Sequence, residues 1–200
     1  MAAPTPIRLL AAVGAIAATA AMAAQARAWS PDAATLARGQ AWAEVLPSGD
    51  GAALIHAAVD IPAPPRTVWA VMTDCAMTRR LVANAVSCRV LSGDIRGGWD
   101  VREQVTRGGW LLPDIHNVYR SDYQPFGLIR FRKAGGNLKV EDGEWRLTPL
   151  NGGAGTRVTY VNRLAANILA PAGLVRGAML RDTPKVLMNL RREAISAART

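Results

Sequence analysis

The sequence predicts an α+β protein in which a curved antiparallel β-sheet packs against one long C-terminal helix. Three observations support this fold class. Hydrophobic residues alternate with a period of two through residues 88–164, and glycine-rich turns interrupt the pattern. A helical period follows from Pro171 to Ala198, and residues 54–84 contain one strand and two short helices. Strands joined by short turns are antiparallel neighbours, and a helix with one apolar stripe covers one face of a sheet.

The first 28 residues are predicted to be a signal peptide rather than part of the fold. Arg8 precedes an uncharged, alanine-rich run at 9–24, and Ala-Arg-Ala at 26–28 has the small-x-small pattern of a cleavage site. No later run is long enough to span a membrane. We therefore expect a single domain at 29–200 that is exported to the periplasm or secreted. A leader that remains attached as a weak anchor is the alternative.

Prolines mark the elements that precede the sheet. Residues 54–61 alternate imperfectly and end at Pro62, which predicts a first strand. Pro65 then begins a short helix that reaches Met72, because proline suits the first turn of a helix. A second short helix is predicted at 76–84.

Six further strands and the final helix follow. The strands are predicted at 88–91, 99–106, 117–123, 128–133, 138–150 and 156–164. Gly143 lies inside one of them and predicts a β-bulge. Pro184 lies inside the final helix and is expected to kink or break it. The apolar stripe of that helix contains Val175, Met179, Val186, Leu187, Leu190 and Ala194.

Alternate residues of a strand share a face, and the two predicted faces of this sheet differ in chemistry. The apolar face is expected to meet the helix and contains Trp99, Val101, Val105, Tyr119, Tyr123, Ile129, Phe131, Trp145, Leu147, Val158 and Tyr160. The charged face is expected to meet water and contains Asp100, Arg102, Arg120, Asp122, Arg130, Arg132, Glu144, Arg146, Arg157 and Arg163. Contact with an anionic membrane surface is an alternative role for these arginines.

Polar side chains are also expected on the apolar face, above all Glu103. A buried carboxylate needs a partner, so Glu103 either pairs with an arginine, lies at the open end of the sheet, or belongs to a ligand cavity. Such a cavity is lined by aromatic side chains with a few polar groups that orient the ligand. The residues predicted to line it are Trp69, Val101, Glu103, Tyr119, Tyr123, Phe131, Trp145, Tyr160, Asn162 and Met179.

The charge balance and one apolar segment bear on the partners. The net charge of +9 favours anionic partners, although export argues against nucleic acid. Residues 164–175 form an apolar segment ahead of the final helix. This segment is expected either to gate a cavity or dip into a membrane, or else to pack in the core. The oligomeric state is not predicted.

Cys75 and Cys88 are predicted to form a disulfide, because an exported chain reaches an oxidising compartment. Two buried thiols are the alternative, and the spacing excludes a CxxC redox site. The sequence has no HExxH, GxSxG or phosphate-binding glycine motif, and its histidines and cysteines are too few for a metal site. No cofactor is expected. Glu103 and His116 are the candidate acids or bases, and a surface role is the simpler interpretation of His116.

Two segments resemble START-like (Bet v 1-like) proteins. In residues 61–74 the resemblance rests on Ile61, Ala63, Pro64, Val68, Trp69 and Asp74, which follow the strand-to-helix pattern of that superfamily. In residues 143–160 it rests on the late hairpin, with Gly143, Trp145, Leu147 and Pro149 followed by Gly155, Thr156, Val158 and Tyr160. The similarity spans about 55–198 and is closest to the polyketide cyclase/dehydrase and coenzyme Q-binding branch.

The resemblance implies a helix-grip fold, with a hydrophobic cavity between the sheet and the C-terminal helix. It also implies a lipid, a quinone or a polycyclic aromatic as the ligand. We therefore interpret the chain as an exported protein that binds a hydrophobic small molecule. One alternative is a cyclase or dehydratase that uses Glu103 or His116 as acid or base, with Tyr160 orienting the substrate. The other is a module that binds a membrane surface or a partner.

Overall fold

A computed structural model describes residues 29–108, 113–166 and 171–199. The predicted signal peptide lies outside these residues. The strands are β1 (Trp42–Pro47), β2 (Ala53–Ile61), β3 (Ala85–Asp94), β4 (Trp99–Thr106), β5 (Ile115–Gln124), β6 (Leu128–Gly136), β7 (Leu138–Leu150) and β8 (Gly155–Ala166). The helices are α1 (Ala33–Ala37), α2 (Pro65–Thr73), α3 (Thr78–Leu81) and α4 (Ala172–Ala197).

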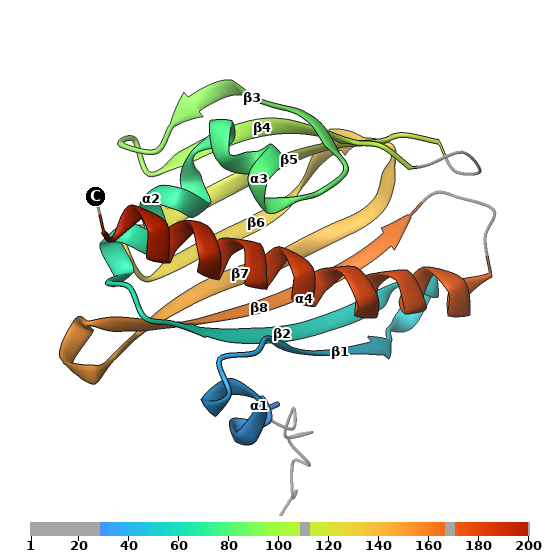
Figure 1. The fold of residues 1–200 in the computed structure, drawn as a ribbon. Helices are drawn as coiled ribbons and strands as arrows, with labels where there is room; N and C mark the ends of the chain where they lie inside the picture. Colours follow the sequence, from blue (N-terminus) through green and yellow to red (C-terminus); the bar gives the residue numbers. More distant parts are fainter. Residues whose placement is uncertain (1–28, 109–112, 167–170, 200) are drawn as a thin grey trace, which may run out of the picture.

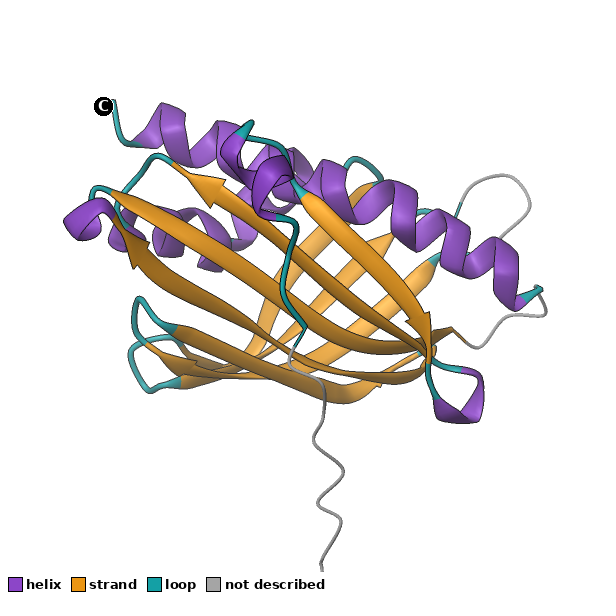
Figure 2. Cartoon of the chain, turned by 90° about the horizontal axis from the view of Figure 1, so that it is seen from below, coloured by secondary structure: helices purple, strands orange, loops and turns teal. Residues whose placement is uncertain are grey.

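The eight strands form one antiparallel sheet that curves around α4. Their order is β1-β2-β8-β7-β6-β5-β4-β3, which leaves β1 and β3 at the two edges. Figure 1 shows α2, α3 and α4 on the same side of the sheet, and Figure 2 shows α4 running along the opening of the curved sheet. The predicted α+β class and the helix-grip arrangement are therefore confirmed. Within the described ranges, no helix is long and apolar enough to cross a membrane.

Two elements were not predicted, α1 and the edge strand β1. The residues of β1 are half-buried or exposed, so the strand lacks the strong apolar alternation that reveals a core strand. Its position is fixed by antiparallel pairing with β2, which places Glu44 beside His56. The His56 Nδ1 and the Glu44 Oε1 lie 2.8 Å apart.

The core lies where α2 and α4 cross the concave face of the sheet. Pro65 occupies the first turn of α2, as predicted, and this helix buries Val68 and Trp69. The fully buried side chains Val158 of β8 and Leu187 of α4 belong to the same cluster. Apolar burial of this kind supplies the main stabilisation of such a domain, and it fixes the helix over the sheet.

The structure corrects the bulge predicted at Gly143 and shows that Pro184 does not break the final helix. Gly143 pairs in regular register with Phe131 of β6 and Asn162 of β8. A Cβ atom at this position would collide with the carbonyl oxygen of Val161, so the glycine allows a close approach of two strands rather than a bulge. The α4 helix continues through Pro184 without a break.

The predicted faces are correct for β5, β6, β7 and β8 and wrong for β4. Arg102 pairs with Tyr119 of β5, and Asp100 pairs with Ser121. Residues that face each other across a pair of strands share a face, so Asp100 and Arg102 point inward. The residues of β4 that point outward are Trp99, Val101, Glu103 and Val105.

This inversion has a physical reason. Asp100 and Arg102 lie two residues apart on one face of β4. Their opposite charges form an ion pair, and this pairing allows both side chains to be buried. On the outer face Trp99 is covered by the guanidinium of Arg120, whose central carbon lies 4.3 Å from the ring centroid. A cation over an aromatic ring stabilises a partly exposed tryptophan, so the apolar alternation of β4 does not mark its buried face.

The predicted disulfide between Cys75 and Cys88 is confirmed. It joins the turn after α2 to the edge strand β3, with the two Cα atoms 5.3 Å apart. Thr78, Leu81 and Val82, which follow the first cysteine, line the cavity described below. The bridge therefore ties one wall of that cavity to the sheet.

Replacing both cysteines with serine is expected to lower the free energy of unfolding by about 2–3 kcal/mol, because the bridge closes a short loop in the unfolded chain. Chemical denaturation with and without a reductant measures this effect. The reductant should destabilise the wild-type protein and leave the double variant unchanged. Equal denaturation midpoints for the oxidised wild type and the double variant would contradict the prediction.

Candidate functional site

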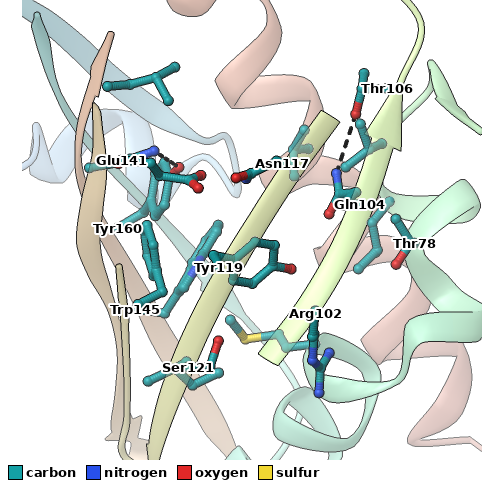
Figure 3. Close-up of a pocket in the computed structure, with 18 of the residues that line it drawn as sticks. Thr78, Arg102, Gln104, Thr106, Asn117, Tyr119, Ser121, Glu141, Trp145 and Tyr160 are labelled. Carbon is teal, nitrogen blue, oxygen red and sulfur yellow. Dashed lines mark hydrogen bonds between the residues drawn. The ribbon is translucent and has the colours of Figure 1, made fainter. Parts of the chain in front are cut away.

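A cavity of about 380 Å³ lies between the concave face of the sheet and the helices α3 and α4. Its apolar wall consists of Ile55, Met72, Leu81, Val82, Ile115, Tyr119, Tyr123, Ile129, Phe131, Leu138, Trp145, Tyr160, Leu164, Met179, Val186 and Leu190. Its polar groups are Thr73, Thr78, Arg102, Gln104, Thr106, Asn117, Ser121, Glu141, Asn162, Asp182 and Thr183. Figure 3 shows labelled aromatic residues between two groups of polar ones. An apolar cavity with a few polar groups is the usual form of a small-molecule site.

Most of the residues predicted to line a cavity do line this one. These are Tyr119, Tyr123, Phe131, Trp145, Tyr160, Asn162 and Met179. Trp69 lies behind the wall, where its ring packs edge-on against Tyr123 at 5.8 Å between centroids. Trp69 therefore supports the cavity without facing it.

Val101 and Glu103 are corrections, because both lie on the outer face of β4. The Arg89 Nε donates a hydrogen bond to the Glu103 Oε2 at 2.8 Å, so an ion pair explains this carboxylate. His116 is exposed on β5, and its register partner is the outward-facing Val105. Neither Glu103 nor His116 lines the cavity.

The aromatic middle of the cavity is built from neighbouring strands. Tyr160 stacks on Trp145 at 4.0 Å and on Phe131 at 6.1 Å between ring centroids. Burial raises the pKa of Tyr119 to about 12, and burial also raises the pKa of Tyr160. Both phenols are therefore neutral hydrogen-bond donors at physiological pH rather than bases.

One end of the cavity is lined by Arg102, which forms a buried ion pair with Asp100 of the same strand. Asp100 is 1% exposed and Arg102 is 7% exposed. The Arg102 Nε donates to both carboxylate oxygens at 3.0 and 2.9 Å, and the Nη2 donates to the Oδ2 at 2.7 Å. Burial lowers the pKa of Arg102, but the hydrogen bonds and charge of Asp100 outweigh burial and leave that pKa above its ordinary value. This end is polar but electrically neutral.

The other end contains Glu141, which sequence reasoning missed. Burial raises the pKa of its carboxyl group to about 7, the like charge of Asp142 adds to the rise, and a hydrogen bond with Asn117 opposes it. Figure 3 shows the polar ends of Glu141 and Asn117 pointing toward each other. The sequence did contain a signal, because alternation along β7 from Trp145 back through Gly143 reaches Glu141 on the same face.

Comparison with known proteins agrees with this geometry. The family model described as "Polyketide cyclase / dehydrase and lipid transport" matches residues 61–191. The chain belongs to this family. No curated protein matches the sequence of the chain.

Solved structures similar to this member of the polyketide cyclase/dehydrase and lipid transport family share its fold. A STAR-related lipid transfer protein from Xanthomonas axonopodis has a TM-score of 0.67 at 16% identity, covering 78% of this chain and 94% of that chain. The Zhui aromatase/cyclase from Streptomyces sp. R1128 has a TM-score of 0.61 at 17% identity, and the match covers 72% of this chain and 94% of that chain. Human STARD10 has a TM-score of 0.62 at 13% identity, and the match covers 84% of this chain and 81% of that chain. These likenesses show the START/Bet v 1 helix-grip fold.

The outer face of this family member is a network of ion pairs. Asp122 accepts hydrogen bonds from Arg120 and Arg132, and Glu144 pairs with Arg130 and Arg146. Pairing of this kind suits a solvated face. Contact with an anionic membrane stays a prediction. The predicted gating segment at 164–175 is described only in part, because 167–170 lie outside the described residues.

Proposed function

We propose that this protein binds a hydrophobic small molecule, such as a lipid, a quinone or a polycyclic aromatic, between the sheet and α4. The supporting observation is the cavity itself, whose wall is mainly aliphatic and aromatic, with polar side chains at a minority of its lining positions. At about 380 Å³ it lies toward the small end of the usual range for ligand sites, about 300–1,000 Å³. That volume suits a single-chain or compact ligand.

The relatives and the disulfide support a carrier or sensor outside the cytoplasm. The family description includes lipid transport, and one structural neighbour is named a lipid transfer protein. The bridge between Cys75 and Cys88 suits an oxidising compartment, in agreement with a cleaved leader at 1–28 and a periplasmic or secreted location. We propose binding rather than catalysis by Glu103 or His116, since both residues lie outside the cavity.

Titration with the neutral hydrophobic probe N-phenyl-1-naphthylamine tests this function. Met179 lines the cavity and is followed by Leu180, which is 48% exposed. Met179→Trp should fill the cavity and weaken probe binding at least tenfold, whereas Leu180→Trp should bind the probe like the wild type. Circular dichroism and denaturation establish that both variants fold. A folded Met179→Trp variant with wild-type affinity would rule out this cavity as the binding site.

A further inference from the structure

Three buried oxygen atoms at one end of the cavity have no hydrogen-bond partner among the residues that the structure describes. They are the Oδ1 of Asn117, the Oε2 of Glu141 and the Oδ1 of Asn162. All three side chains line the cavity. Buried polar atoms are nearly always paired, so three unpaired acceptors around one cavity indicate a missing group that donates hydrogen bonds.

The three acceptors come from strands whose geometry brings them together. Asn162 of β8 is 2% exposed and faces Gly143, two residues along β7 from Glu141. Its Nδ2 donates to the Tyr160 hydroxyl at 2.7 Å, which leaves its Oδ1 available. Asn117 of β5 is close enough to Glu141 for hydrogen bonding to lower the pKa of the carboxyl group. Figure 3 shows Tyr160, Glu141 and Asn117 around the same part of the cavity.

We propose that this end of the cavity binds the protonated primary amino group of a single-chain or compact hydrophobic ligand. The proposal rests on the proposed function and names the ligand class. A primary ammonium group has three N–H donors and no acceptor, which matches three unpaired acceptors. It also supplies the positive charge that a buried carboxylate needs. A hydroxyl group brings one donor, and a carboxylate would bring a like charge.

The charges around the cavity favour a cation at this end alone. Tyr119 of β5 and Tyr160 of β8 are neutral because burial raises the pKa of both phenols. Arg102 of β4 is neutralised by Asp100. Asp182 of α4 forms ion pairs with Arg181 and Lys185, which share its helix. Glu141 therefore gives this end its negative charge.

A pH dependence follows from the position of Glu141. A bound ammonium group requires the ionised carboxylate, and an alkylamine stays protonated below about pH 10. As pH falls through about 7, the amine must displace a proton from Glu141, so its affinity should fall by up to about tenfold per pH unit. Binding of an uncharged ligand lacks this requirement.

The test compares dodecylamine, dodecanol and dodecanoate, each below its micelle concentration, in displacing N-phenyl-1-naphthylamine at pH 7.5 and pH 5.5. We expect dodecylamine to bind at least tenfold more tightly than dodecanol at pH 7.5 and to lose that advantage at pH 5.5. Glu141→Gln should remove the preference, so that dodecylamine binds no more tightly than dodecanol to this variant at either pH. Glu144→Gln, on the outer face of the same strand, is the matched control and should behave like the wild type.

The remaining outcomes separate this proposal from the proposed function. Equal affinities for the amine and the alcohol, or tightest binding of dodecanoate, would overturn the amine proposal and leave hydrophobic binding intact. An amine preference that persists in Glu141→Gln would overturn it as well. If neither the probe nor any of the three ligands binds, the proposed function itself fails.

Discussion

Replacing Asp100 with asparagine is expected to lower the free energy of unfolding by about 3–5 kcal/mol. The substitution keeps the size of the side chain but removes the only charge that the structure places against the buried guanidinium of Arg102 within the described residues. An unpaired buried charge is far more destabilising than the loss of the attraction itself. Denaturation in guanidinium chloride measures the change.

Asp122→Asn is the matched control, because Asp122 forms a similar pair with Arg120 on the outer face of β5. That pair is partly exposed and should contribute no more than about 1 kcal/mol. The double variant Asp100→Asn/Arg102→Met should recover most of the lost stability, since it removes both charges. Equal losses in the two single variants would show that the inward pair is not a buried charge pair.

Glu141→Gln is expected to change the pH dependence of stability by about 3 kcal/mol in ligand-free protein. The folded-state pKa of Glu141 is about 7, above its ordinary value of 4.5, so the folded state favours the protonated form. Below about pH 4.5 both states are protonated and the wild type suffers no penalty. As pH rises from about 4.5 to about 7, the unfolded wild type releases this proton while the folded carboxyl keeps it, so the wild type loses this stability and the glutamine variant does not.

Denaturation midpoints at pH 4, 6 and 8 measure this difference. Glu141→Gln should match the wild type at pH 4 and exceed it at pH 8. Glu144→Gln serves as the control, because Glu144 carries its charge on the outer face beside Arg130 and Arg146. Parallel pH curves for the wild type and Glu141→Gln would show that the carboxyl group is solvated.

The sequence predicted the parts of the fold where pattern and burial agree. The helix from Pro171 onward, the Pro65 helix and the strands β5 to β8 were predicted in their correct order and with their correct faces. The strand β4 was inverted because Asp100 and Arg102 neutralise each other inside while Trp99 is covered by Arg120 outside. Alternation of hydrophobicity cannot reveal a pair of opposite charges that lies on the buried face.

The sequence predicted the aromatic residues of the candidate site but not its buried carboxylate and amide, Glu141 and Asn117. The aromatic lining, such as Trp145 and Tyr160, follows from strand periodicity. Glu141 and Asn117 become meaningful only when burial and hydrogen-bond partners are known, and those depend on contacts between strands far apart in sequence. Glu103 was a candidate cavity residue because the inner and outer faces of β4 were exchanged in the prediction.

Native mass spectrometry of protein purified without detergent shows whether the cavity holds a hydrophobic molecule. We expect one small molecule per chain that organic solvent releases, and we expect it in Leu180→Trp but not in folded Met179→Trp. A wild-type protein that is unliganded, and that remains unliganded after incubation with a lipid extract and with dodecylamine, would contradict the proposed function.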